Sequence, residues 1–306
     1  MKQFFCYSTI AFLCLFSLSS CFTGVESTKK ITMSKDDRRL QTPSPEESLL
    51  ADIIAEPLSE WKSGKKFLAT DTKINLILDA APDNAEIARG DTLRFVRSES
   101  LTAPDGMQAA VVLFDAGNAS YRLLTGQSVN KMDSYSSRQI PLLIDLDMIE
   151  GTRQILIGKQ CWILSSLWKN ALGLPIKGRK FVPVTITDVL PGDSSFPLKV
   201  VFSDMNGCSA WVPMNYNDTG ISTRKFASLF SLTDIKEKYP HLSPENWALI
   251  QEGRVAAGMT KEECRLSLGN PSDVNAGHDY SRTLEIWKYP DGSYLQFADG
   301  LLLLMN

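Results

Sequence analysis

The sequence predicts a mainly β, multi-domain protein in which small β-barrel or bent-sheet modules precede a C-terminal α+β module of two helices and three strands. Between about residues 60 and 220, short apolar runs of strand length alternate with the turn residues Gly, Asp, Asn and Pro. After residue 240, two runs carry helix-capping signals, and three strand-like runs separated by Asp-Gly follow them. The chain has 306 residues, a length that suits two or three domains.

Residues 1–20 are predicted to be a lipoprotein signal peptide. The apolar run from Phe4 to Leu18 has signal-peptide length and is short for a membrane span. It ends in the sequence LSSC at Cys21, which is typical of a bacterial lipobox, so Cys21 is expected to be lipidated and to become the N-terminus. The alternative is an ordinary secretory signal in which Cys21 is incidental.

Residues 21–43 are predicted to be a flexible tether, because they are polar and charged and show no periodic apolar pattern. Phe22 occupies the position after the lipidated cysteine, where an aspartate would indicate retention in the inner membrane. We therefore expect lipid attachment to the outer membrane, with the protein facing the periplasm or the cell surface. The net charge of −3 provides no basic excess, so a nucleic acid partner is not expected.

Residues 44–150 are predicted to form a short helix and the first β module. Ser44, Pro45 and Glu47 provide an N-cap, a proline at the first helical position and a capping-box acid. Strand-like runs bounded by turn residues follow: KKFLATD, KINLILDA, DTLRFVRS, MQAAVVLFDAG and ASYRLLTG.

Residues 151–235 are predicted to form the second β module, from the runs RQILIG, KQCWILSS, KFVPVTITDVL, PLKVVFSDMNG and CSAWVPMN. GKQC in this region has a counterpart, GKKF, in the first module. In both modules an apolar strand ends in an Asp-and-Gly turn before an aromatic strand returns. This pattern resembles tandem bacterial Src-homology-3-like barrels over residues 62–130 and 155–220. The alternative is a single larger β-sandwich across 60–220.

Residues 240–306 begin with two predicted helices. In the first, Ser243 and Pro244 provide an N-cap and a first helical proline, and Gly253 is placed to end the helix. Three strand-like runs follow the second helix, TLEIWKY, SYLQFA and LLLLMN, and the Asp-Gly pairs between them predict hairpin turns.

Cys264 lies in the second of these helices, in the sequence GMTKEECRLSLGNP. Thr260 is the expected N-cap, and Glu263 completes a capping box. Met259 and Cys264 occupy the two positions of a hydrophobic staple, and Leu268 lies one turn after Cys264. We therefore expect Cys264 to be buried against Met259 and Leu268, with acidic neighbours that disfavour a thiolate.

The sequence GRVAAGMTKEECRLSLGNPSDV, followed by LEIWKYPDGSYLQFADGLL, resembles the SmpA/OmlA (BamE-like) domain of bacterial envelope lipoproteins over residues 243–306. The match is carried by a helix start, a helix end and two aromatic strands: Gly258, Met259, Thr260, Leu268, Gly269, Pro271, Trp287, Tyr289, Phe297 and Gly300. The resemblance implies an ααβββ fold and a non-enzymatic role. The family includes a component of the outer-membrane β-barrel assembly machine, and its fold is similar to secreted inhibitors of β-lactamase. That component is one small domain, whereas this chain has about 200 further residues before the module, so membership of the machine does not follow from the fold.

Catalytic chemistry would depend on very few residues. His241 and His278 are the two histidines of the chain, and any Ser–His–Asp or Cys–His arrangement needs one of them. Cys264 with His278 is the sharpest candidate, and it defines one alternative function, a cysteine-dependent cell-envelope hydrolase. No nucleophile turn typical of cell-wall peptidases accompanies Cys264, so no catalytic residue is expected.

Cys161, Cys208 and Cys264 are expected to be buried free thiols, because an odd number cannot form a complete disulfide framework; a Cys161–Cys208 bridge is the alternative. The sequence has no Cys-x-x-Cys pair, no His-x-x-x-His pair and no Asp-rich calcium loop, so neither a metal nor a cofactor is expected. Asp145 and Asp147 are interpreted as charged spacers around an apolar strand.

Aromatic residues in or beside turns of the second β module are the best candidates for ligand binding: Trp162, Trp168, Trp211 and Tyr216. Aromatic grooves on β modules bind peptides or glycans, and core packing is the alternative for each residue. We therefore expect a non-enzymatic outer-membrane lipoprotein that binds or scaffolds envelope proteins or cell-wall material such as peptidoglycan. The alternative functions are the hydrolase described above and an inhibitor of a secreted or periplasmic enzyme.

Overall fold

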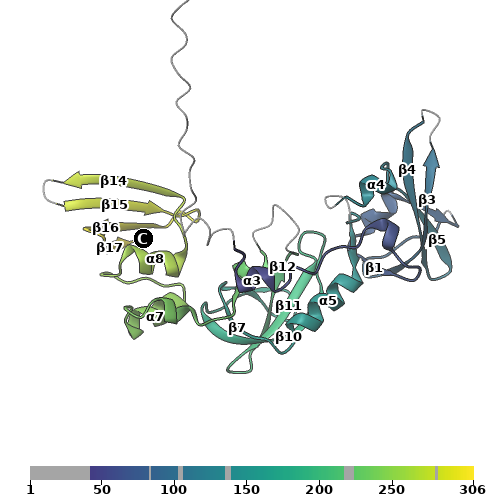
Figure 1. Ribbon diagram of the computed structural model, residues 1–306. Coiled ribbons are helices and arrows are strands. Elements are labelled where there is room, and N and C mark those ends of the chain that lie inside the picture. The colour runs from purple at the N-terminus through teal and green to yellow at the C-terminus, as the bar shows by residue number, and fades with distance from the viewer. Residues whose placement is uncertain (1–41, 83, 103–105, 135–138, 217–223, 280–281) are drawn as a thin grey trace, which may run out of the picture. The chain divides into compact units, whose positions relative to one another are not determined.

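The computed structural model describes residues 42–306, apart from 83, 103–105, 135–138, 217–223 and 280–281 (Figure 1). The predicted signal peptide, Cys21 and the tether up to residue 41 lie outside the described residues. The described part is mainly β, with several sheets and a half-barrel, which confirms the coarse fold class predicted from the sequence. Within the described ranges, no helix combines the length and the apolar character that a membrane span requires.

The first sheet has six antiparallel strands in the order β2-β5-β4-β3-β1-β6. Its strands are β1 (Lys66–Ala69), β2 (Leu78–Ala81), β3 (Thr92–Thr102), β4 (Gln108–Ala116), β5 (Ala119–Leu124) and β6 (Leu143–Asp145). Three short helices accompany them, namely η1 (Leu58–Glu60), η2 (Thr72–Leu76) and α4 (Val129–Met132). The inward side chains Phe67, Leu93 and Phe114 belong to a core of this sheet alone. The run KINLILDA was expected to be one strand, but its first half forms the 3-10 helix η2 because Asp71 caps Lys73 N–H (2.9 Å).

The second sheet has seven antiparallel strands in the order β13-β7-β10-β11-β12-β8-β9. Its strands are β7 (Gln160–Ile163), β8 (Leu167–Lys169), β9 (Pro175–Lys177), β10 (Val182–Pro191), β11 (Leu198–Asp204), β12 (Ser209–Met214) and β13 (Phe230–Ser231). The helix α6 (Phe226–Leu229) precedes β13. This sheet has its own hydrophobic core, which includes Ile163, Ile186 and Phe202. The core of the second sheet also includes Ile144 of β6, and Leu68 of β1 packs against it, so residues of the first sheet contribute to it. The division into two β modules stays a prediction.

The segment after the N-terminal helix α3 (Pro45–Ser48) contributes to the second core although it precedes the first sheet in sequence, whereas α3 itself has no buried residue. Ser44 and Glu47 form the predicted capping box, with hydrogen bonds of 3.1 and 2.8 Å. Leu50 and Ala55, which follow the helix, are buried in the core of the second sheet. The segment after the predicted tether therefore packs mainly on the second module.

The helix α5 (Leu146–Leu156) corrects the expectation of a strand at RQILIG. Asp145 ends β6 and caps the helix by accepting a hydrogen bond from Asp147 N–H (3.0 Å), so Asp145 and Asp147 are not spacers around an apolar strand. The side chains of Met148, Thr152 and Leu156 are buried at helical spacing, and α5 lies against β10 (Figure 1). The helical spacing of apolar residues is visible in the sequence only when the segment considered begins at Leu146 and not at Arg153.

The C-terminal module has two helices and four strands, one strand more than predicted. The elements are η4 (Ile235–Lys238), α7 (Pro244–Gln251), α8 (Lys261–Leu268), β14 (Asp273–Asp279), β15 (Arg282–Lys288), β16 (Tyr294–Ala298) and β17 (Leu301–Met305). The sheet is an antiparallel meander in the order β14-β15-β16-β17. The sequence DVNAGHD of β14 was not among the predicted strands. It forms an edge strand through backbone pairing with β15.

The turn and cap signals of this module are confirmed. Asp299 and Gly300 form the two-residue turn between β16 and β17, and both have positive φ angles of 48° and 85°. Ser243 caps α7 by accepting from Asn246 N–H (3.1 Å). Gly253, with φ of 65°, ends that helix as predicted.

Cys264 occupies an apolar position of α8. Thr260 and Glu263 form the predicted capping box: Glu263 N–H donates to Thr260 Oγ1 (3.2 Å), and Thr260 N–H donates to Glu263 Oε2 (2.7 Å). Met259 and Cys264 are both buried in the core of the module. Leu268, however, is 37% exposed and is not among the buried residues of that core.

We predict that Thr260→Ala lowers the free energy of unfolding by about 1 kcal/mol, because Glu263 N–H loses its side-chain acceptor. Thr72→Ala, an exposed threonine in η2, serves as the matched control and should change stability little. Denaturant unfolding followed by tryptophan fluorescence measures the difference. An unchanged midpoint for Thr260→Ala would contradict the role of the capping box.

Candidate functional site

The candidate site lies on the second sheet, where two adjoining hollows form one groove. The hollows have volumes of about 270 and 470 Å³ and share Pro183, Asp204 and Met205. We call this the Pro183 groove and define it by its main lining residues: Gln160, Trp162, Trp168, Lys177, Gly178, Arg179, Pro183, Thr185, Asp204, Met205, Asn206 and Gln251.

Strand alternation places the apolar wall of the groove on the outer face of the sheet. Trp162 of β7 pairs with Pro183 of β10. Their neighbours Cys161 and Val184 point into the core, so Trp162 and Pro183 point outward. Met205, which is 83% exposed after the end of β11, extends the apolar surface. The half-buried indole of Trp162 is thus available to a ligand on one side.

One end of the groove is cationic. Lys177 and Arg179 are exposed, and no carboxylate within the described ranges forms an ion pair with either. Arg179 donates instead to Gln251 Oε1 (2.7 Å). The Asp204 carboxylate is engaged in the turn after β11, where it accepts from Cys208 N–H (2.8 Å). The groove therefore combines an apolar wall with two cations, Lys177 and Arg179, and with the Asp204 carboxylate, which forms no ion pair with either cation in the described structure.

The loop between β9 and β10 holds the cationic end against α7. Lys180 N–H donates to the Gln251 carbonyl (2.9 Å), and the Gln251 side chain donates to the Phe181 carbonyl (3.2 Å). The Phe181 ring stacks on Trp247 with ring centroids 5.6 Å apart. The Lys180 side chain donates to the Leu266 carbonyl in α8 (2.8 Å), and burial lowers the pKa of Lys180 to about 8. Arg179 is consequently held by a well-anchored backbone.

The cationic end is absent from the predictions made from sequence, although the sequence contains a signal for it. Residues 151–187 include no Asp or Glu, and they carry six basic residues: Arg153, Lys159, Lys169, Lys177, Arg179 and Lys180. The net charge of the whole chain is −3, so the positive charge of this segment is not apparent from the overall composition. A count of charge by segment would have found it.

The structure separates the aromatic residues that the sequence singled out. Trp162 lies in the Pro183 groove, and Trp211 lies on the same face beside the β8–β9 hairpin. Trp168 and Tyr216 are 5% and 4% exposed and belong to the core, so they are not exposed binding residues. Trp168 forms part of the groove wall, but its ring packs edge-on against Phe202 at 5.1 Å between centroids.

The cysteine thiols do not form an activated nucleophile. Burial, and secondarily the charge of Glu263, raises the pKa of Cys264 to about 12. Burial likewise raises the pKa of Cys161 to about 12. Cys161, Cys208 and Cys264 are all free, so the alternative bridge is not formed, and Cys208 is exposed rather than buried as expected. A protonated, buried thiol is unreactive at neutral pH.

The histidines do not complete a catalytic pair in the described structure. His241 is exposed, and its Nε2 lies 2.9 Å from a carboxylate oxygen of Glu262. His278 belongs to β14, and its side chain is outside what the structure describes. Within the described residues, no histidine side chain is hydrogen-bonded to Cys264.

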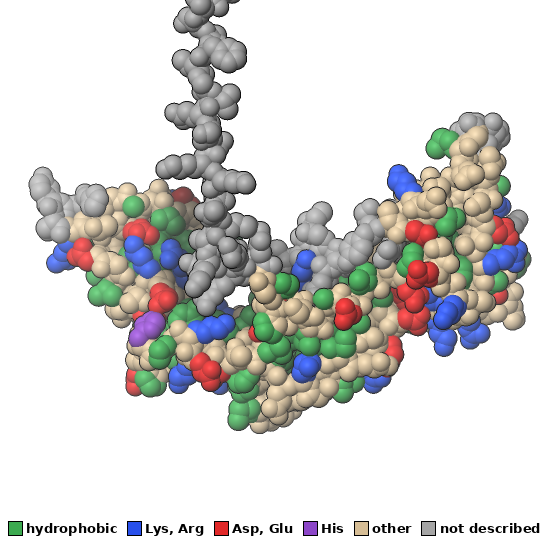
Figure 2. Space-filling model, in the orientation of Figure 1, with side chains coloured by type: hydrophobic (Ala, Val, Ile, Leu, Met, Phe, Trp, Pro, Cys, Tyr) green, Lys and Arg blue, Asp and Glu red, His purple; other side chains and the backbone are tan. Residues whose placement is uncertain are grey.

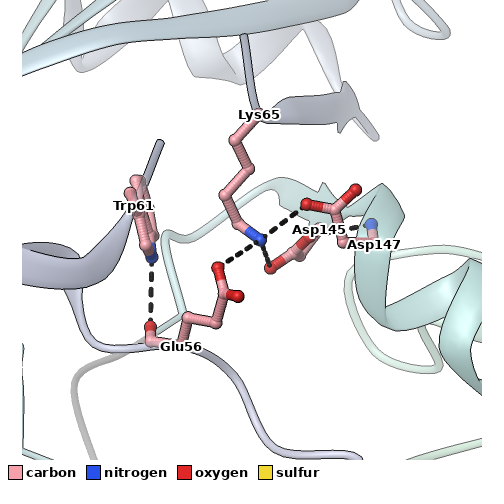
Figure 3. A network of polar contacts seen from close by, with 5 residues as sticks. All are labelled: Glu56, Trp61, Lys65, Asp145 and Asp147. Carbon is pink, nitrogen blue, oxygen red and sulfur yellow. Dashed lines mark hydrogen bonds and ion pairs between the residues drawn. The ribbon is translucent and has the colours of Figure 1, made fainter. Parts of the chain in front are cut away.

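A second polar cluster surrounds the buried ammonium of Lys65 at the start of α5 (Figure 3). The side chain is 3% exposed, and Nζ lies 2.9 Å from Asp147, 3.0 Å from Asp145 and 3.1 Å from Glu56. Burial acts to lower the pKa of Lys65, but the charge of Asp145 and hydrogen bonds to all three carboxylates raise it above the ordinary value. An ammonium that stays protonated cannot act as a base or nucleophile, so this cluster is structural.

Neither metal chemistry nor similarity to known proteins assigns a function. No group of three or more His, Cys, Asp or Glu side chains in the described part of the chain is arranged to hold a metal ion. Acidic and basic side chains are interspersed on the face drawn in Figure 2. No protein-family model, curated protein or solved structure matched the chain. The function is therefore argued from the groove.

We predict that Lys65→Met destabilises the protein by about 3–5 kcal/mol, because Asp145 remains buried without its cation. Lys66→Met, which removes the exposed neighbouring ammonium, is the control. Folding already raises the pKa of Asp145 through burial. A carboxyl that binds its proton more tightly when folded gives stability at low pH that is lost as the pH rises. The loss should accordingly be smaller at acid pH than at pH 8; equal losses in both variants would contradict the cluster's role.

Thiol labelling of the native protein should modify Cys208 rapidly, and Cys161 and Cys264 only after unfolding, because the latter two are buried and protonated. Cys208→Ser should remove the fast reaction, whereas Cys264→Ser should leave it. Mass spectrometry of the labelled peptides identifies the sites. Fast labelling of Cys264 that is slowed by His278→Ala would favour the hydrolase alternative.

Proposed function

We propose that this protein is a non-enzymatic, lipid-anchored protein of the outer membrane that binds another envelope component through the Pro183 groove. The observation that carries the proposal is the half-buried indole of Trp162, which lies beside Pro183 on the outer face of the second sheet and lines the Pro183 groove. Tryptophan in such a setting is the residue type that most often dominates binding energy.

The ligand that suits this groove is an extended polypeptide segment with apolar and acidic side chains. The wall of Trp162, Pro183 and Met205 takes apolar groups, and Lys177 and Arg179 at the other end attract carboxylates. Glycan strands of the cell wall could stack on Trp162 as well, but the cationic end favours a partner that carries negative charge. We therefore propose an acidic segment of an envelope protein as the partner, and the carboxylates of peptidoglycan stem peptides make cell-wall material the alternative that the crosslinking experiment distinguishes.

The C-terminal module supports a binding role through the resemblance to SmpA/OmlA lipoproteins. Trp287, Tyr289 and Phe297, which carry part of that resemblance, are buried together in the core of the module. Two capped helices precede the meander, in the order that the resemblance implies, with β14 added between them and the strands. The two separate sheets before it similarly support the resemblance to tandem Src-homology-3-like modules.

The lipid anchor would raise the effective concentration of the groove near a partner in the same membrane, so that weak binding suffices. Attachment of Cys21 to the outer membrane would confine the groove to a thin layer next to its partner, which raises avidity without new contacts. The hydrolase alternative is disfavoured because burial keeps the Cys264 thiol protonated. Binding is thus the activity that the described surface supports best.

A photo-crosslinking residue placed at Gln160, which is exposed at the groove, should capture the partner in cells. We expect one principal protein adduct that is lost in Arg179→Glu, because the reversal removes the cation and repels the acidic ligand. Glu99, exposed on β3 of the first sheet, is the matched control position. Adducts of peptidoglycan fragments would identify cell-wall material instead, and equal capture at both positions would defeat the groove assignment.

Cys21→Ala should release the protein from the membrane fraction, because the lipid is the principal attachment. Ser20→Ala, which keeps the cysteine and a small residue before it, should leave the attachment intact. Fractionation of cells followed by immunodetection measures the distribution. A Cys21→Ala protein that remains fully membrane-bound would overturn the lipoprotein assignment.

A further inference from the structure

The hairpin between β8 and β9 exposes leucine side chains at its tip. Leu172 is 84% exposed and Leu174 is 57% exposed, and Leu167 at the start of β8 is 69% exposed. Isolated exposed leucines are ordinary on protein surfaces. Three on one short hairpin form a concentrated apolar surface, which is a feature of interaction sites.

This exposure is built into a well-ordered turn. Asn170 Oδ1 accepts hydrogen bonds from the N–H groups of Leu172 and Leu174, both at 3.0 Å. The Asn170 carbonyl accepts from Gly173 N–H (2.9 Å) and from Trp211 Nε1 (2.7 Å). Gly173 has φ of 80°, and a side chain there would touch the Trp211 ring. The hairpin tip is therefore fixed on Trp211 and holds its leucines away from the core.

Positive charge surrounds the base of the tip. The ammonium groups of Lys169 and Lys199 lie 4.9 and 4.6 Å from the centre of the Trp211 ring. Neither lysine forms an ion pair with a carboxylate in the described part of the structure. The hairpin also lies within residues 151–187, which contain no Asp or Glu. The apolar leucines lie at the tip of the hairpin, and Trp211 with its two lysines lies at the base. A lipid interface has the same sequence of environments, with the acyl chains followed by the charged headgroups.

We propose that the β8–β9 hairpin is a membrane-contacting element, with Leu172 and Leu174 entering the interface of an anionic lipid surface. Lys169 and Lys199 then meet the negatively charged headgroups, and Trp211 supports the tip at the boundary between headgroup and acyl chain. The inference rests on the lipid anchor proposed above, which would bring this surface to the membrane.

The predicted tether permits this contact. Twenty residues, 22–41, separate the lipidated cysteine from the described chain, and they span at most about 70 Å when extended. The lipid would hold the protein at the membrane, and the hairpin would add a second contact with the same surface.

The test uses the full lipidated chain with a solvent-sensitive fluorophore at Leu172→Cys, in a Cys208→Ser background that removes the exposed thiol. The matched control position is Leu76→Cys, because Leu76 is 83% exposed in the first module. Vesicles consist of phosphatidylcholine alone or of an equimolar mixture with phosphatidylglycerol. Flotation reports attachment, and emission colour with quenching by brominated lipid reports insertion of the label.

We expect the label at position 172 to enter the anionic vesicles, whereas the label at position 76 stays in water. Lys169→Gln with Lys199→Gln should shift the equilibrium between inserted and free tip by about 30-fold toward the free tip. Protein that floats while both labels stay in water overturns this inference and leaves the anchor standing. Protein that does not float on either vesicle overturns the anchor and the inference together. Insertion that is equal on both vesicles and indifferent to the lysines overturns the electrostatic part.

Discussion

The connection between the first sheet and α5 depends on the ion pairs of the buried Lys65 ammonium. Three carboxylates converge on it from separate parts of the chain: Glu56 before the first sheet, and Asp145 and Asp147 at the start of α5. Asp145 also ends β6 and caps the helix. Without the lysine, these acids would repel one another at the point where the chain leaves one module for the next.

The helix that starts at this cluster is what closes the second core. Its buried face packs with β10, and the core behind it also receives Leu50 and Ala55 from the N-terminal segment. The covered face of the second sheet is therefore occupied by the protein itself. Among the described residues, Trp162 and Trp211 lie on the opposite, outer face, which is the face proposed to interact with other molecules.

The two surfaces proposed for binding share the same acid-free segment of the chain. The Pro183 groove uses Lys177 and Arg179, and the hairpin tip uses Lys169 together with Lys199 from β11. Both join an aromatic ring to cations that lack acidic partners among the described residues, which suits acidic polypeptides and anionic lipids. Because the groove and the hairpin belong to the same sheet, contact of the hairpin with the membrane would also fix the orientation of the groove relative to the membrane.

The sequence by itself determined the features whose causes are local. Capping boxes at Ser44 and Thr260, the Asp299-Gly300 turn and the buried position of Cys264 follow from hydrogen bonds and turn angles within a few residues, and all are present. Tertiary structure decided the rest. It buried one side of the helix α5, which includes most of RQILIG, against β10, and it gave DVNAGHD a strand partner. It also placed Trp168 in the core and Trp162 on the outer face of the sheet. The face on which a strand residue lies is set by the register with neighbouring strands, and no local pattern encodes that register.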